Sequence, residues 1–570
     1  MPACCARRPS TGLPTRSPKS SPPERPMHAD DAALPTAARG AARFGGLPGG
    51  AETALLLVAL VLAWEALARM VLANAFALAA PSQIALQLAE SWDLYARNLG
   101  ATLWTAVQGF VIGNLIAILA AALIVTIPAL ERPVFSAALA IYALPIIALA
   151  PILMVLLDRD AAMVALSALA VIFTTLVAAA LGLRSADPAA LDMVHVLGGS
   201  TWQKLVRVRV PAALPSLFAG LRIAAPAAVL GATVGEFMGA ERGLGVLITN
   251  ALADLETTRV WTVAALATAL STGGYLLIGW VGRRLTPWAG EMEIVQAAER
   301  GGGARRSGGQ GQRLARLAGT IGVNLLVVFG GWALFIHLAG LNAFFAKGPV
   351  DVWQFLFAVP DAASNRQSVF GGLPTTIGNA LLGFLAGMTG GVLVAILFVL
   401  RPSVERAAMP VAIALRSIPI LATTPLVILL FGRTLAATTM IVAILSFFPT
   451  LINLVVAMRL TRRSITDLLR VLNADRWTIL WRAELPTALP ALMASARIAV
   501  PTSILGAVIV EWLITGVGMG NAILSGVYHA EYAILWSVAV VLTLLSMAAY
   551  GLISLAERAV LRRFAPEHLQ

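Results

Sequence analysis

The residues of this chain that are best placed to do chemistry are charged or phenolic side chains inside long apolar segments. Glu236 and Glu511 each fall near the end of such a segment, and Arg416 lies about three turns into another. Tyr142 holds the nearest corresponding position to Arg416 in the first half of the chain. If these segments span a membrane, charge at that depth is costly, and all four side chains are candidates to line a translocation path.

Each of these candidates also has a structural interpretation. The two glutamates could cap a re-entrant turn, because Gly243 and Gly518 follow them closely, or they could pair with an arginine. Arg416 could face an anionic solute, snorkel to the bilayer surface or pair with another helix. The sequence leaves these alternatives open.

The usual constellations for covalent or metal chemistry do not occur in the sequence. No Ser-His-Asp set, metal-ligand spacing or pair of carboxylates converges, and Cys4 and Cys5 both lie in the N-terminal tail. The three lysines, Lys19, Lys204 and Lys347, all lie outside any G-x-x-x-x-G-K-[ST] loop. We therefore expect no catalytic residue, no metal site, no bound cofactor and no ATPase site of the chain's own.

A long internal repeat organises the whole chain. Residues 187–250 and 462–525 superpose at a constant offset of 275 residues. The matched pairs include Asp192 with Asp467, Pro211 with Pro486, Arg222 with Arg497, Glu236 with Glu511 and Gly243 with Gly518. A repeat of this length indicates two copies of one unit, so each copy needs a role in any functional interpretation.

Composition predicts that both copies lie in a membrane. The chain is 59% hydrophobic and 12% charged, with a mean hydropathy of +0.83, and a soluble protein carries about twice that charge. Apolar runs long enough to cross a ~30 Å hydrocarbon core occur at 52–73, 99–127, 134–157, 161–182, 216–238 and 260–281, and again at 318–339, 374–400, 407–431, 435–458, 491–514 and 534–556. We expect an all-α polytopic membrane protein of about 12 transmembrane helices.

The two halves should have the same orientation, because each contributes an even number of spans. This makes them parallel six-helix repeats. Arginine is concentrated in the N-terminal tail, the loops at 184–215 and 459–490, the mid-chain linker and the C-terminal tail. The positive-inside rule places all of these segments, and both termini, in the cytoplasm. The net charge of +12 is thus explained by topology and not by binding to nucleic acid.

Four domains follow from these patterns. Residues 1–50 form a basic tail rich in Pro, Ser, Gly and Arg that is expected to be disordered, and Met1 and Met27 remain alternative starts. Residues 51–284 form the first repeat, and residues 318–564 form the second. Between them, residues 285–317 form a Gly- and Arg-rich flexible linker.

The two arginine-rich loops are each predicted to form a helix–turn–helix on the cytoplasmic face. Residues 188–197 have the apolar spacing of a helix, and Gly198 or Gly199 suits a helix end with positive φ. A second helix from Thr201 is expected to stop at Pro211. In the second loop Asn473 replaces Gly198, and Asn is the residue that next best tolerates this conformation.

These loops resemble the "EAA" signature of the membrane subunits of ATP-binding-cassette importers. Asp192, Gly198 and Pro211 match the spacing of that signature, with Gly198 six residues after the aspartate and Pro211 thirteen after the glycine. Asp467, Asn473 and Pro486 match it less closely. The signature Glu-Ala-Ala is replaced by Asp-Met-Val in one half and Asp-Leu-Leu in the other. These departures question whether the two halves function equally.

The resemblance implies a type I importer permease whose two fused halves act as a pseudo-dimer in a bacterial inner membrane. It implies that each loop docks into one of two cytoplasmic ATPase subunits, which bind the ATP. It further implies a periplasmic or lipid-anchored substrate-binding protein. The most similar permeases favour nitrate, a sulfonate, taurine, bicarbonate or a pyrimidine as the solute. Without a partner, the loops would be amphipathic connectors at the lipid headgroups.

A secondary active transporter with parallel repeats is the alternative function. It would need a coupling-ion site or proton relay at the membrane midplane, where the spans are nearly free of Asp and Glu. It would not need matched cytoplasmic loops. Divergence of the loops leads to one further hypothesis, that the 192–211 loop couples more strongly to its ATPase than the 467–486 loop.

Overall fold

The structure is a computed structural model of the 570-residue chain. It describes residues 58–59, 61–71, 78–254, 256–288, 326–338, 340–416, 424, 427–428, 430–461 and 463–564. The chain divides into two units, residues 1–55 and 56–570, and every described residue belongs to the second. The tail expected at 1–50 and most of the linker expected at 285–317 lie outside the described residues.

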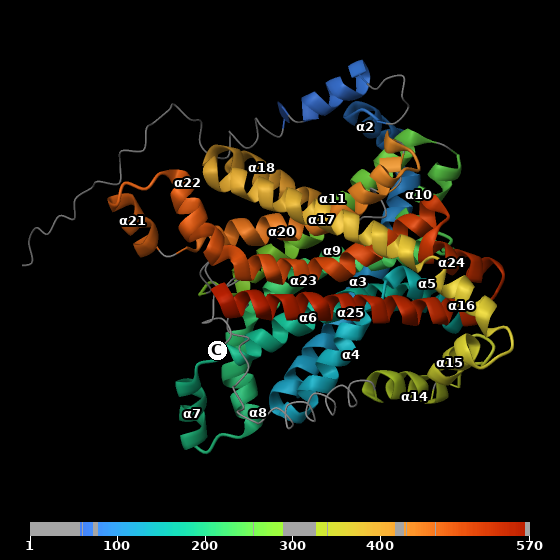
Figure 1. Cartoon of the computed structure of the whole chain (residues 1–570), viewed down its shortest axis with the longest axis horizontal. Helices are drawn as coiled ribbons and strands as arrows, with labels where there is room; N and C mark the ends of the chain where they lie inside the picture. Colours follow the sequence, from blue (N-terminus) through green and yellow to red (C-terminus); the bar gives the residue numbers. More distant parts are fainter. Residues whose placement is uncertain are drawn as a thin grey trace, which may run out of the picture. The chain divides into compact units, whose positions relative to one another are not determined.

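The first half is entirely helical over its described residues (Figure 1). Its α-helices are α2 (Pro81–Glu90), α3 (Trp92–Thr126), α4 (Glu131–Ala143), α5 (Ile146–Leu156), α6 (Arg159–Arg184), α7 (Pro188–Val196), α8 (Thr201–Lys204), α9 (Val210–Phe237), α10 (Leu244–Ala253) and α11 (Thr257–Leu285). Short π and 3₁₀ turns complete it: η1 (Leu67–Val71), η2 (Pro128–Leu130) and η3 (Leu205–Arg209).

The second half repeats this order over the part of it that is described. Its α-helices are α14 (Gly331–Leu338), α15 (Pro349–Phe357), α16 (Ala362–Phe370), α17 (Leu373–Leu400), α18 (Pro402–Arg416), α20 (Leu435–Arg459), α21 (Arg463–Val471), α22 (Arg476–Ile479), α23 (Leu485–Val510), α24 (Gly518–Tyr528) and α25 (Tyr532–Phe564). Its π turns are η4 (Leu326–Gly330), η5 (Leu480–Glu484) and η6 (Glu511–Thr515).

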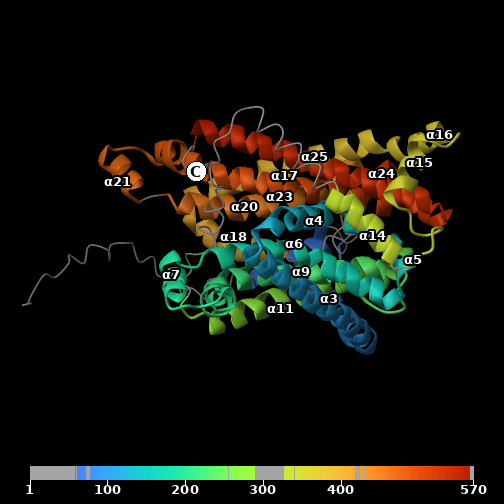
Figure 2. The same ribbon diagram turned by 90° about the horizontal axis from the view of Figure 1, so that it is seen from below.

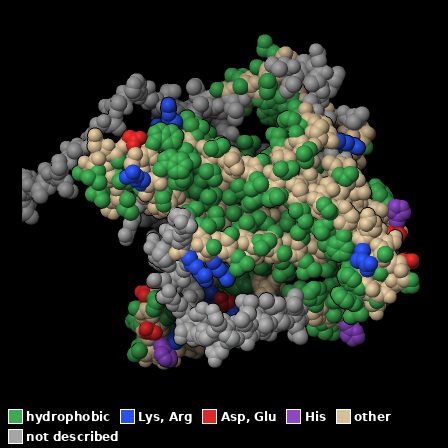
Figure 3. All heavy atoms as spheres, in the orientation of Figure 1, with side chains coloured by type: hydrophobic (Ala, Val, Ile, Leu, Met, Phe, Trp, Pro, Cys, Tyr) green, Lys and Arg blue, Asp and Glu red, His purple; other side chains and the backbone are tan. Residues whose placement is uncertain are grey.

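Eight helices among the described residues are long and apolar enough to cross a membrane, or nine if one bent pair counts as a span. This confirms an all-α polytopic membrane protein. The predicted number of twelve spans stays a prediction, because the first span of each half and residues 417–423 are described only in part or not at all. In Figure 3, apolar side chains cover the middle of the visible face, and charged side chains are sparse there.

The bent pair differs from the single helix expected at 134–157. There α4 and α5 meet at 97°, with the break at Leu144 and Pro145. Proline disfavours the helical conformation in the residue before it, and Leu144 accordingly has an extended ψ of 120°. The span is therefore broken near its middle.

Glycines allow the long helices within each half to pack closely. A Cβ at Gly109 of α3 would lie 2.3 Å from Ser167 of α6, and one at Gly383 of α17 would lie 2.3 Å from Val442 of α20. Contact this close is typical of helix pairs in membranes, where small residues let the backbones approach each other. The same close helix–helix contact occurs in both copies of the repeat.

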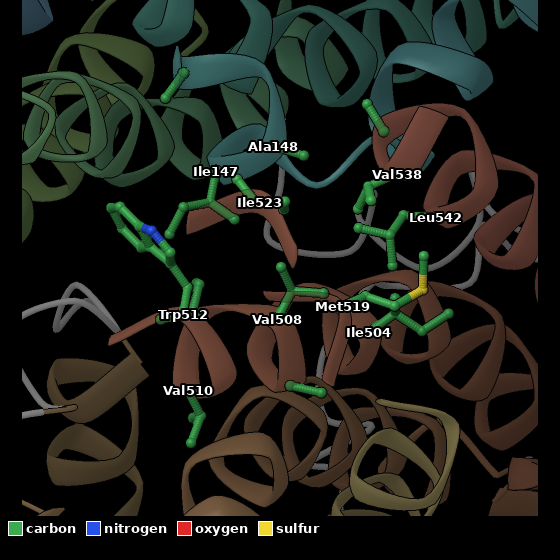
Figure 4. Packing of buried hydrophobic residues seen from close by; sticks show 14 of the residues in the cluster. Ile147, Ala148, Ile504, Val508, Val510, Trp512, Met519, Ile523, Val538 and Leu542 are labelled. Atoms are coloured by element: carbon green, nitrogen blue, oxygen red, sulfur yellow. The ribbon is translucent and has the colours of Figure 1, made fainter. Parts of the chain in front are cut away.

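The two halves share one apolar core, shown in Figure 4. Ile147 and Ala148 of α5, from the first half, lie in one buried cluster with Val508, Ile523 and Leu542 of α23, α24 and α25. All five side chains are fully buried. Figures 1 and 2 show α7 and α21 at the same end of the long helices, as parallel repeats require.

Candidate functional site

The first arginine-rich loop folds into the helix–turn–helix that its sequence predicts. Asp187 caps the start of α7 by accepting a hydrogen bond from the backbone N–H of Ala189 at 3.0 Å. The helix ends at a turn in which Gly198, one of the two glycines proposed for it, has a positive φ of 76°. The N–H of Gly199 donates to the carbonyl of Val194 at 2.8 Å, which closes the turn. Ser200 then caps α8.

The second loop makes the same turn with an asparagine. Asn473 has a φ of 58°, and the N–H of Ala474 donates to the carbonyl of Leu469 at 2.9 Å. The prediction that the turn survives this replacement is confirmed. Asp475 caps α22 at the position that Ser200 holds in the first loop, and it accepts hydrogen bonds from the backbone N–H and the hydroxyl of Thr478.

Pro211 does not stop the second helix of the first loop, so that expectation is wrong, and Pro486 does not stop its counterpart either. Residues Thr201–Phe237 form one continuous helix, and Pro211 lies inside it. A proline ring normally clashes with the carbonyl four residues earlier. Here a π turn, η3, precedes the proline, and the N–H of Val210 reaches back five residues to Leu205. The wider turn accommodates the ring, and η5 does the same before Pro486 in the second half.

Each loop helix exposes an apolar triad at matched positions. Met193, Val196 and Leu197 in α7 and the adjoining turn correspond to Leu468, Val471 and Leu472 in the second loop. Val196 and Val471 are 85% and 83% exposed. The triads are at i, i+3 and i+4, so each forms one helix face. The sequence prediction did not include these triads as docking residues, although their apolar i, i+3, i+4 spacing is visible in the sequence.

The signature acidic residues lie on the same two helices but differ in their contacts. Asp192 is exposed and makes no hydrogen bond or ion pair with any described residue. Asp467 is also exposed, but its carboxylate accepts from the guanidinium of Arg470 at 3.1 Å. In the second half, Arg476 additionally donates to Glu484 at 2.7 Å and to the carbonyl of Val399 at 3.2 Å, and its counterpart in the first half is Thr201.

At the other end of the fifth spans, Glu236 and Glu511 each bind the start of the following short helix. The N–H of Gly245 donates to Oε2 of Glu236 at 2.8 Å, and the N–H of Gly520 donates to Oε2 of Glu511 at 3.2 Å. Both glutamates are buried. A carboxylate at a helix N-terminus satisfies free N–H groups, so the capping alternative has direct support.

Glycine is required beside each of these carboxylates. Gly243 and Gly518 have positive φ values of 140° and 79°. A Cβ at either position would lie 2.2 or 2.3 Å from the carboxyl carbon of Glu236 or Glu511. The repeated Glu and Gly residues therefore form one structural unit in each half.

Residues of the second spans, α3 and α17, complete these caps, with more hydrogen bonds to the glutamate in the second half. The Thr102 and Thr376 hydroxyls each accept from the backbone of the capped helix, at 2.9 Å from the N atoms of Leu244 and Met519. In the second half the Thr376 hydroxyl also donates to Glu511 at 2.7 Å, and Asn379 donates to it at 3.0 Å. Oε1 of Glu236 has no hydrogen-bond partner among the described residues.

Contacts between the halves lie close to the remaining candidates. The hydroxyl of Tyr142 donates to the carbonyl of Ile498 at 3.2 Å, so this residue joins α4 to α23. Phe237 and Trp512, which directly follow the two glutamates, contact each other with ring centroids 5.5 Å apart and ring planes tilted by 56°. Arg416 is the last residue of α18, and its side chain lies outside the described part of the structure.

The described residues offer no group of three or more His, Cys, Asp or Glu side chains that could hold a metal ion. The described residues form two homologous helix bundles that share one core, and a loop helix projects from each bundle at the same end. These features define a polytopic membrane permease made of two fused halves.

Comparison with known proteins identifies the family. The model for the binding-protein-dependent transport system inner membrane component matches residues 113–287 and 387–562. The two matches together cover more than half of the chain, so the chain belongs to this family and contains its domain twice. It is a permease subunit of the ATP-binding-cassette type, as the resemblance in its sequence indicated.

Single-domain permeases are among its curated relatives. The chain is 31% identical to the formylaminopyrimidine transport permease protein ThiX of Halalkalibacterium halodurans, over 42% of this chain and 95% of that protein. It is 28% identical to the putative aliphatic sulfonates transport permease protein SsuC of Bacillus subtilis, over 34% and 70%. It is 25% identical to the taurine transport system permease protein TauC of Escherichia coli, over 44% and 88%. No solved structure matches the chain.

Proposed function

We propose that this chain forms the complete translocation path of a small-solute importer and binds two ATPase subunits through its two loop helices. The observation that carries the proposal is the matched pair of exposed apolar triads, Met193, Val196, Leu197 and Leu468, Val471, Leu472. Exposed apolar side chains on a projecting helix favour docking into a groove of a partner. Their repetition in register favours two identical partner subunits.

The continuous helices suggest how motion of the loops reaches the membrane. Thr201–Phe237 and Arg476–Leu513 each run without a break from the loop to the far end of the fifth span. A partner that draws α7 and α21 together would therefore tilt both long helices. Their far ends meet at Phe237 and Trp512, so the tilt would open or close that contact. This is alternating access driven from the loops.

ATP hydrolysis belongs to the partners in this proposal. The chain's lysines lie outside any phosphate-binding loop motif, so ATP would be bound by the ATPase subunits and not by the permease. A substrate-binding protein would deliver the solute at the end opposite the loops. The arginine-rich loops and both termini would then face the cytoplasm of a bacterium, with the chain in the inner membrane.

The solute is proposed to be a small anion or heterocycle. This rests on the named substrates of the relatives, which include a formylaminopyrimidine, aliphatic sulfonates and taurine. Of the four path candidates, Glu236 and Glu511 would act by holding α10 and α24 in place at the outer gate, given their hydrogen bonds to those helices. Tyr142 would act at the seam between the halves, and Arg416 would line the path.

A docking variant tests the proposal. Val196→Asp with Val471→Asp places a charge in both triads, and we expect loss of ATPase co-purification and of ATP-driven uptake in proteoliposomes. His195→Asp is the matched control, since it is exposed on the opposite side of α7 and should leave both unchanged. Uptake that persists in the double variant, or that needs no ATPase, would refute loop docking and favour a secondary transporter.

A further inference from the structure

The second half contains a partly buried ion pair between its last two long helices, α23 and α25. Arg497 of α23 donates to the carboxylate of Glu557 of α25 at 3.0 Å. The same guanidinium lies 5.8 Å from the ring of Tyr550. An arginine inside a membrane span normally has a counter-charge of this kind, because a charge without a partner is costly there.

The repeat shows what the first half has at the same three positions. The offset of 275 residues matches Arg497 with Arg222, Tyr550 with Tyr275, and Glu557 with Gly282. The arginine and the aromatic ring are kept, and Arg222 lies 4.0 Å over the ring of Tyr275. The carboxylate is lost, because glycine has no side chain.

Arg222 therefore lacks a counter-ion within the described residues. It makes no hydrogen bond and no ion pair with them, and its Nε is buried without a partner. The cation–π contact with Tyr275 offsets part of the cost, but it leaves the positive charge unneutralised. The Arg222 side chain as a whole is only partly buried, so a group from outside the chain can approach its guanidinium.

The surroundings of Arg222 indicate where that group comes from. A Cβ at Gly279 would lie 3.1 Å from Nε of Arg222, which puts the guanidinium at the level of Trp280. Trp280 is exposed, and Arg284 lies 5.4 Å over its ring, as in the aromatic and basic belt at a membrane surface. Leu276 and Leu277 on the same helix are exposed apolar residues that suit contact with lipid chains.

We infer that Arg222, between α9 and α11, is a binding site for the phosphate of an anionic phospholipid in the leaflet on the side of the loop helices. The lipid phosphate takes the place that Glu557 holds in the second half. The guanidinium donates to the phosphate oxygens, and the acyl chains lie along Leu276 and Leu277. Basic pockets between spans on the cytoplasmic side bind lipid headgroups in this manner.

The repeat also supplies matched variants for a test. The purified full chain is reconstituted with equal amounts of phosphatidylglycerol and phosphatidylcholine, washed with detergent, and the lipid retained per protein is measured by native mass spectrometry. We expect retained phosphatidylglycerol in the wild type and a roughly fivefold lower ratio to phosphatidylcholine in Arg222→Gln. Glu557→Gln frees Arg497 and is expected to add a second retained phosphatidylglycerol.

A further pair of variants tests whether a carboxylate from the chain itself can replace the lipid phosphate beside Arg222. Gly282→Glu combined with Phe218→Met copies the second half, where a flexible methionine, Met493, replaces the ring that would crowd the new side chain. It should lose the retained lipid, whereas Phe218→Met alone should keep it. Equal retention of both lipids by the wild type would overturn the inference. A second result would also overturn it: no lipid preference in the wild type, together with a change of Trp280 fluorescence on adding nitrate that is lost in Arg222→Gln. The site would then bind a soluble anion.

Discussion

Gly198 and Asn473 occupy the same turn of the two loops and adopt similar backbone conformations, with φ of 76° and 58°. This conformation costs a residue with a Cβ roughly 1–2 kcal/mol, and Asn is tolerated because its side chain bonds locally. A Cβ at Gly198 would meet nothing within 4 Å. The restriction on this residue is therefore set by the backbone alone and not by packing.

Replacement of this glycine should loosen the first loop. Gly198→Ala is expected to destabilise the turn by roughly 1–2 kcal/mol, seen as faster hydrogen–deuterium exchange in residues 188–204. Gly100→Ala is the control, since Gly100 lies inside α3, also has free space around it and has no positive φ. There alanine should stabilise the helix by roughly 0.5–1 kcal/mol. An unchanged exchange rate in the loop of Gly198→Ala would contradict this account.

The turn residues could be predicted from the sequence because backbone conformation is a local property. The cap formed by Glu236 remained one of several alternatives, since the partner N–H of Gly245 lies across a turn whose geometry the sequence does not define. The ion-pair difference between Arg222 and Arg497 required the contact between α9 and α11, which depends on how whole helices pack.

At the scale of the elements, the two loops form the same helix–turn–helix with different N-cap residues. Ser200 caps α8 with a neutral hydroxyl, whereas Asp475 caps α22 with a carboxylate. The hydrogen bond from the Thr478 hydroxyl is the main cause that lowers the pKa of Asp475 below its ordinary value. The π turns before Pro211 and Pro486 could not be predicted, because a proline in sequence signals a stop unless the preceding turn widens.

The charged cap makes the second loop sensitive to acid. Because the folded pKa of Asp475 is lowered, its stabilising effect is present above the unfolded pKa and is lost as the pH falls through the folded pKa. We expect α22 to fray below about pH 4, while α8 does not. Hydrogen–deuterium exchange of residues 474–484, corrected for the intrinsic pH dependence of amide exchange, measures this. Asp475→Ser should remove the difference, and an acid effect that survives it would have another origin.

At the scale of the whole molecule, two fused halves are free to diverge as two identical subunits are not. Their common fold could be predicted from the repeat. The core in which Ile147 and Ala148 meet Val508 could not, because a repeat shows which residues correspond but not which faces meet. Fusion places each loop on a defined half, and the carboxylates of Asp192 and Asp467 already differ in their partners.

This difference predicts unequal coupling. Asp192 has no described partner, so its carboxylate is free to accept hydrogen bonds from an ATPase subunit, and charged hydrogen bonds contribute about 1.5–3 kcal/mol. Asp467 is already paired with Arg470 at 3.1 Å. We expect Asp192→Ala to lower ATP-driven uptake at least roughly tenfold and Asp467→Ala to lower it less. Uptake and solute-stimulated ATP hydrolysis in proteoliposomes measure both effects.

Removal of Arg470 provides the internal control for this prediction. In an Arg470→Ala background the carboxylate of Asp467 has no ion-pair partner in its own loop. Asp467→Ala should then lower ATP-driven uptake more than it does in the wild type. Arg470→Ala should leave the loss of uptake caused by Asp192→Ala unchanged, since Asp192 lies in the other loop. If the two aspartates cost equal amounts of uptake in the wild type and Arg470→Ala changes neither, the ion pair does not set the strength of coupling. The divergence at the signature positions would then be neutral, and the two loops would drive the halves equally.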